Sequence, residues 1–209
     1  MRLGATIPRS CAAPRCTARR APRLTRSSLW PAAVLAACAF TPAAAQQISA
    51  KYDWAMPSQY REVQLRAQET QRALLLAMAD SMPEQLYRDA AAEGQRDFAR
   101  QVHHAANADL YIVSRYIKGE EMPAVQDTAV TFASRAGLKR FINAAYDYST
   151  KALREQSDTD RNTLVWYFGQ KLPKWLVWDE LNQHTLWTAG QIVANFRKHG
   201  MAPPPFAYY

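Results

Sequence analysis

The part of this chain that we expect to fold contains no cysteine. The chain has three cysteines, Cys11, Cys16 and Cys38, and all of them lie within the first 45 residues. Residues 46–209 therefore offer no disulfide, no thiolate metal ligand and no cysteine nucleophile. At 164 residues, this segment is long enough to form one domain that buries about two-thirds of its unfolded surface without such cross-links.

Acidic residues are missing from the first 45 positions, which instead hold seven arginines. An apolar run from Leu29 to Phe40 leads to Ala43-Ala44-Ala45, and this order predicts a secretory signal peptide over residues 1–45, cleaved before Gln46. The run is too short for a transmembrane helix, which needs about 20 residues. We therefore expect a protein exported to the periplasm or the medium.

A second cleavage site stays open. Leu35-Ala36-Ala37-Cys38 has the form of a lipoprotein box, in which Cys38 would carry the lipid and anchor the mature protein to a membrane. The well-formed site at Ala45 favours the soluble product.

A basic surface is also lacking once the leader is set aside. Of the 26 lysines and arginines, seven lie in the leader, so 19 remain against 18 acidic residues. The formal charge of +8 thus falls to about +1, and this balance argues against nucleic acid as a partner. The sequence also has no phosphate-binding loop and no Ser-His-Asp arrangement.

Sustained strand alternation and Asn-Gly turns are absent, whereas apolar residues recur at steps of three and four. We predict four helices, at about 57–82, 95–117, 134–155 and 173–200, in a single all-α four-helix-bundle domain over 46–209. The expected stripe of the first helix is Tyr60, Val63, Ala67, Thr70, Leu74 and Met78.

The short apolar segment 164–169 lies between two of these helices, where it would cap the bundle or wall a pocket. Four tryptophans lie in or near this end of the domain, and we expect most of them in the core: Trp166, Trp175, Trp178 and Trp187.

The last helix carries polar residues where a buried stripe is expected. His184, Thr188, Gln191 and Asn195 follow one another at i, i+4, i+7 and i+11, beside or within the apolar face. Each buried polar group costs about 1–3 kcal/mol unless it is paired. The pattern therefore indicates a polar site inside the bundle.

Four motifs in order resemble those of the DinB-like four-helix-bundle family. They are Ser81–Tyr87, Phe98–Ala106, Phe141–Tyr148, and the last helix with its Gly190-Gln191, Phe196-Arg197, Gly200 and following prolines. The resemblance covers about residues 56–206. It implies a helical bundle related to damage-inducible bacterial proteins and to some thiol-dependent transferases and isomerases.

The resemblance also implies a metal site. Three histidines in that family hold a divalent ion such as zinc or nickel, and the first two fall on His104 and His184. The third falls on Thr188, which is a poor ligand. Glu180, one turn before His184, is a conceivable substitute, and the helical pattern by itself does not choose between His103 and His104.

Two functions follow. One is a small-ligand-binding or catalytically degenerate bundle with an incomplete metal site, its ligand lined by Thr188, Gln191 and Asn195. The alternative is a metal-dependent enzyme, similar to a transferase or hydrolase, with His104 and His184 as ligands. The first fits the missing histidine better. A small molecule is the expected partner, and the choice between monomer and homodimer stays open.

Overall fold

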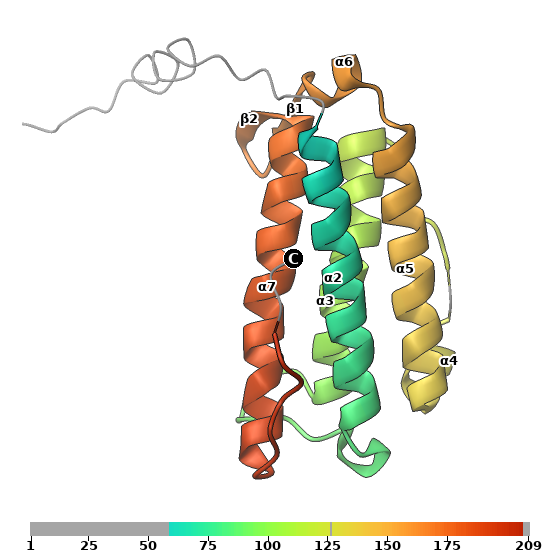
Figure 1. The fold of residues 1–209 in the computed structure, drawn as a ribbon. Coiled ribbons are helices and arrows are strands. Elements are labelled where there is room, and N and C mark those ends of the chain that lie inside the picture. Colours follow the sequence, from blue (N-terminus) through green and yellow to red (C-terminus); the bar gives the residue numbers. More distant parts are fainter. Residues whose placement is uncertain (1–58, 126, 207–209) are drawn as a thin grey trace, which may run out of the picture. The chain divides into compact units, whose positions relative to one another are not determined.

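Four long helices account for most of the residues that the computed structural model describes, which are 59–125 and 127–206. They are α2 (Tyr60–Ser81), α3 (Phe98–Ile112), α5 (Arg135–Glu155) and α7 (Lys174–Lys198), and they lie side by side (Figure 1). Both α2 and α3 pack against both α5 and α7. The all-α four-helix bundle predicted from the sequence is therefore confirmed.

The predicted helix ends agree closely with the structure where they are described. The Ser134 side chain accepts a hydrogen bond from the Gly137 amide and so caps α5. Gly119 and Gly200 follow helical segments with φ of 70° and 67°, a conformation that glycine adopts without strain. The predicted start at Pro57 lies outside the described residues, as does the whole predicted leader.

Four shorter helical elements lie between the long helices, and the sequence pattern did not predict them. They are η1 (Glu84–Leu86), the π-helical η2 (Val113–Lys118) that continues α3, α4 (Thr128–Ala133) and α6 (Asp158–Arg161). Each is six residues or fewer, which is too short for a periodic pattern to show. In the described part of the chain, no helix is both long and apolar enough to cross a membrane.

A β-hairpin corrects the expectation that strands would be nearly absent. β1 (Leu164–Tyr167) pairs antiparallel with β2 (Gln170–Pro173). The turn residues Phe168 and Gly169 have φ of 43° and 85°, as a two-residue primed turn requires. Phenylalanine is unusual at the first of these positions, so the turn carried no Asn-Gly signal.

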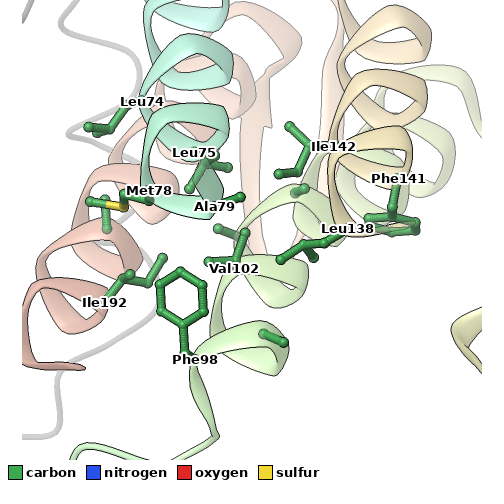
Figure 2. Close-up of a cluster of buried hydrophobic side chains, with 14 of the residues drawn as sticks. Leu74, Leu75, Met78, Ala79, Phe98, Val102, Leu138, Phe141, Ile142 and Ile192 are labelled. Atoms are coloured by element: carbon green, nitrogen blue, oxygen red, sulfur yellow. The ribbon is translucent and has the colours of Figure 1, made fainter. Parts of the chain in front are cut away.

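The core consists of two apolar clusters at different levels of the bundle. One lies around Phe98, with side chains from α2, α3, α5 and α7 (Figure 2). The other lies around Trp178, with Ile112, Leu153 and Leu181. On α5 and α7, the residues between these two groups include buried polar side chains. Thr188, in the polar stripe of α7, therefore lies between two hydrophobic layers.

The buried face of α2 differs from the predicted stripe. Val63 is 39% exposed, whereas Gln64, Gln68 and Gln71 are buried. Gln64 donates from Nε2 to the Trp175 carbonyl oxygen and to Asp179 Oδ1, each at 2.8 Å. These bonds pair the buried Gln64 amide nitrogen with α7, and they explain why a polar residue is buried here in place of the apolar Val63.

Fewer of the four tryptophans are buried than the sequence predicted. Trp175 and Trp178 are buried, but Trp166 and Trp187 are 68% and 74% exposed. The two exposed rings belong to the hairpin and to the hairpin-facing part of α7, where no helix covers them.

Candidate functional site

Two histidines from different helices meet in the bundle. His104 of α3 and His184 of α7 are each partly buried, and their Nε2 atoms lie 3.3 Å apart. The rings are edge to face, with centroids 5.1 Å apart. The neighbouring His103 instead stacks on Phe141, with centroids 4.3 Å apart. The structure thus brings together the two histidines that the family resemblance selected.

Both imidazoles are held in the neutral form. Burial, the charge of Arg96, and the two neighbouring histidines lower the pKa of His104 to about 4. Burial and Arg96 also lower the pKa of His184. Near neutral pH one Nε2 therefore donates to the other, and the pair shares a single hydrogen bond. The buried Nδ1 of His184 has no hydrogen-bond partner in the described structure.

The other predicted lining residues have different environments. Thr188 is 2% exposed and lies one turn after His184 on α7. Gln191 is exposed and accepts a hydrogen bond of 2.5 Å from Gln101 of α3. Asn195 is buried and donates to the Asp89 carbonyl oxygen at 3.0 Å. Its observed bond therefore joins α7 to the loop before α3.

The donor set does not fit a tight metal site. Two nitrogens bound to one tetrahedral zinc ion lie about 3.3 Å apart, so the spacing of the histidine pair is suitable. Among the described residues, however, no three His, Cys, Asp or Glu side chains form a group that could hold a metal ion. Glu180 is therefore not placed as a third ligand, and the hydroxyl of Thr188 is a weak donor to zinc or nickel.

An open pocket of about 490 Å³ adjoins the histidine pair. We call it the hairpin pocket, because residues of the β-hairpin form one wall and residues of α7 form the other. Its lining residues are Tyr167, Phe168, Gln170, Leu172, Glu180, Gln183, His184 and Trp187. The volume lies within the range of about 300–1,000 Å³ that is usual for small-molecule sites. The prediction that segment 164–169 caps the bundle or walls a pocket thus agrees with the structure.

A buried carboxyl group lies five residues after His104 on α3, and the sequence analysis gave it no role. Asp109 of α3 is fully buried, and neither of its carboxyl oxygens has a hydrogen-bond partner in the described structure. Burial is the main cause that raises its pKa to about 7. The signal was present in the sequence, because Asp109 falls on the apolar stripe of its helix.

Comparisons with known proteins bear on the fold. No family model matches the sequence, and no curated protein matches it. The structure is similar to the crystal structure of a DinB-like protein from Bacillus cereus, with a TM-score of 0.59 and 18% sequence identity. The match covers 69% of this chain and 95% of the other. The chain therefore has the fold of a DinB-like protein, as the sequence resemblance implied.

Proposed function

We propose that this protein is an exported bundle that binds a small ligand beside the histidine pair and whose metal site is incomplete. One observation carries the proposal: His104 and His184 face each other as neutral imidazoles 3.3 Å apart, while buried Thr188 occupies the place of the family's third histidine.

Neutral imidazoles suit ligand binding better than metal capture here. Each ring offers one donor and one acceptor, and His184 lines the hairpin pocket. Two imidazoles alone do not hold zinc tightly, because a catalytic zinc site usually takes three protein ligands. A ligand group that bonds to Nε2 of either ring would replace the bond that the two histidines now make to each other.

Metal analysis of the full protein, purified without an affinity tag, tests the proposal. We expect zinc and nickel well below one equivalent per chain. A stoichiometric metal that His184→Ala removes would contradict the proposal and favour the metal-dependent enzyme.

Export is part of the proposal and has its own test. Intact mass and N-terminal sequencing of the secreted or periplasmic protein should place the mature start near Gln46. A lipid-modified Cys38 in the membrane fraction would replace the soluble product with an anchored one.

A further inference from the structure

We propose that the hairpin pocket binds an organic cation, with a quaternary or alkylated ammonium group held against its aromatic rings and beside Glu180. This inference rests on the proposed function, since it names the chemical class of the small ligand. Three features of the pocket carry it: its exposed aromatic walls, the strained turn that holds one of them, and the carboxylate in its lining.

Aromatic side chains line both walls of the pocket. Tyr167 and Phe168 come from the hairpin and Trp187 comes from α7. Phe168 and Trp187 are 67% and 74% exposed. Large apolar side chains that gather around one opening indicate a binding surface, whereas scattered ones do not.

The turn holds Phe168 in place at the expense of backbone strain. Its φ of 43° suits glycine or asparagine, and a residue with a Cβ and a bulky ring adopts it reluctantly. The ring packs against Tyr116 and Tyr167, with centroids 5.3 and 4.8 Å away. Strain of this kind gathers at binding sites, and here it presents an aromatic ring at the rim of a pocket.

The lining residues of the pocket carry one formal negative charge. Glu180 is the one carboxylate among the described lining residues, and no lysine or arginine lines the pocket. Burial raises the pKa of Tyr167 to about 12, and the negative charge of Glu180 is the second cause of this shift. Glu180 therefore interacts electrostatically with the aromatic wall of the pocket.

Aromatic faces and one carboxylate together select an organic cation. The faces of tryptophan, tyrosine and phenylalanine attract an alkylated ammonium group, which carries little bound water. The carboxylate adds a charge of the opposite sign. An anion would be repelled by Glu180, and an uncharged aromatic ligand would gain nothing from it.

Calorimetric titration of the full protein with choline and with dimethylbutanol, its uncharged carbon isostere, tests the inference. We expect choline to bind about tenfold more tightly than the isostere, a difference that corresponds to one cation–π contact and one ion pair. Glu180→Gln should weaken choline binding about tenfold and leave the isostere unchanged. Equal affinity for the two compounds, or no effect of Glu180→Gln, overturns the inference.

Aromatic variants provide a matched control. Trp187→Leu and Phe168→Leu should weaken choline binding, whereas Trp166→Leu should not. Trp166 lies on the same hairpin and is similarly exposed, but it does not line the pocket. Thermal unfolding of each variant confirms that it is folded. Equal losses for Trp166→Leu and Trp187→Leu overturn the inference.

Two further measurements distinguish a lipid headgroup from a free cation, and failure of this inference from failure of the proposed function. Sedimentation with phosphatidylcholine vesicles distinguishes a lipid headgroup from a free cation, and in both cases Trp187→Leu should weaken binding. A stoichiometric metal on the histidine pair would contradict the proposed function whatever choline does. If the metal content is low and choline and its isostere bind equally well, the organic cation is the wrong ligand class, but the proposed function stands.

Discussion

At the scale of single residues, Thr188 decides the chemistry of the histidine pair. His104 and His184 already have the Nε2 separation that one ion requires, at 3.3 Å. Thr188 lies on the same helix as His184, one turn later, and is buried. The site therefore lacks a third nitrogen rather than a suitable geometry.

Thr188→His should raise zinc affinity about tenfold or more, because a third imidazole completes the usual ligand number. Calorimetric titration with zinc measures the change, and adding His184→Ala to the variant should abolish it. Arg197→His is the matched control, since it adds a histidine to the exposed end of α7 and should change nothing. Equal affinities of the native protein and Thr188→His would mean either that another residue already completes the site or that the bundle does not bring position 188 to the histidine pair. Glu180→Ala should destroy zinc binding in the first case and leave it unchanged in the second.

Asp109 makes stability depend on pH. Its pKa is raised from 3.8 to about 7 in the folded protein, so the protonated carboxyl is favoured by folding. Its contribution to the free energy of unfolding is therefore full below pH of about 4 and is lost as the pH rises through about 7. Asp109→Asn should remove this decline and make the protein more stable than the native one at pH of about 8, by up to several kcal/mol.

Urea unfolding at a series of pH values checks the Asp109 prediction. His104 has the opposite effect on the pH dependence of stability. Its pKa falls from 6.5 to about 4 on folding, so its contribution to the free energy of unfolding is lost as the pH falls below about 6.5. That loss occurs in both proteins and cancels in the comparison. Asp147→Asn changes an exposed carboxylate paired with Arg72 and should leave the decline intact. Parallel curves for Asp109→Asn and the native protein would show that Asp109 is not the cause.

At the scale of elements, α4 lies against the first turn of α5 at a glycine. A Cβ on Gly137 would lie 2.1 Å from the Val130 carbonyl oxygen, which no real contact allows. The lack of a side chain at this position therefore permits α4 to pack where it does.

Gly137→Ala should destabilise the protein by about 1–3 kcal/mol, because the overlap exceeds the gain in helix propensity. Gly190→Ala on α7 is the matched change, since nothing lies within 4 Å of its added Cβ. Gly190→Ala should stabilise the protein by about 0.5–1 kcal/mol. Chemical denaturation measures both values. A stabilising Gly137→Ala would show that α4 moves away from α5 at little cost.

At the scale of the whole molecule, hydrogen bonds between buried polar side chains join the helices to one another. Ser149 of α5 donates to Gln68 of α2 at 2.7 Å, and Gln64 accepts from the buried Arg161 of α6 at 2.6 Å. These bonds cross from element to element, so they set the rotation of each helix relative to its neighbours. Loss of one such residue leaves a buried partner without a bond.

We expect residues 46–209 to fold as well as the full chain, because the interactions that join the described helices lie within this segment. Circular dichroism should show a mainly helical spectrum and an unchanged melting temperature. A shorter segment that starts after Ala67 should melt at a lower temperature, since it lacks Gln64 and its bonds to α7. A lower melting temperature for 46–209 would show that the first 45 residues stabilise the bundle.

The sequence by itself determined the helices and the polar character of α7. Apolar spacing, Ser134 and the glycines at 119 and 200 indicate where the long helices begin and end, because such signals act within one or two turns of the chain. The turn at Phe168 could not be predicted in this way, since its conformation depends on packing of the ring against Tyr116, far away in sequence.

Only the tertiary structure decided which side chains meet. A helical pattern gives the angle of a residue around its own axis, but it does not say which helix lies opposite. His103 and His104 both flank the apolar stripe of α3, and packing turns one onto Phe141 and the other onto His184. The same packing buries three glutamines of α2 in place of Val63 and sets the hairpin beside α7, because each arrangement satisfies polar groups or covers apolar ones across elements distant in sequence.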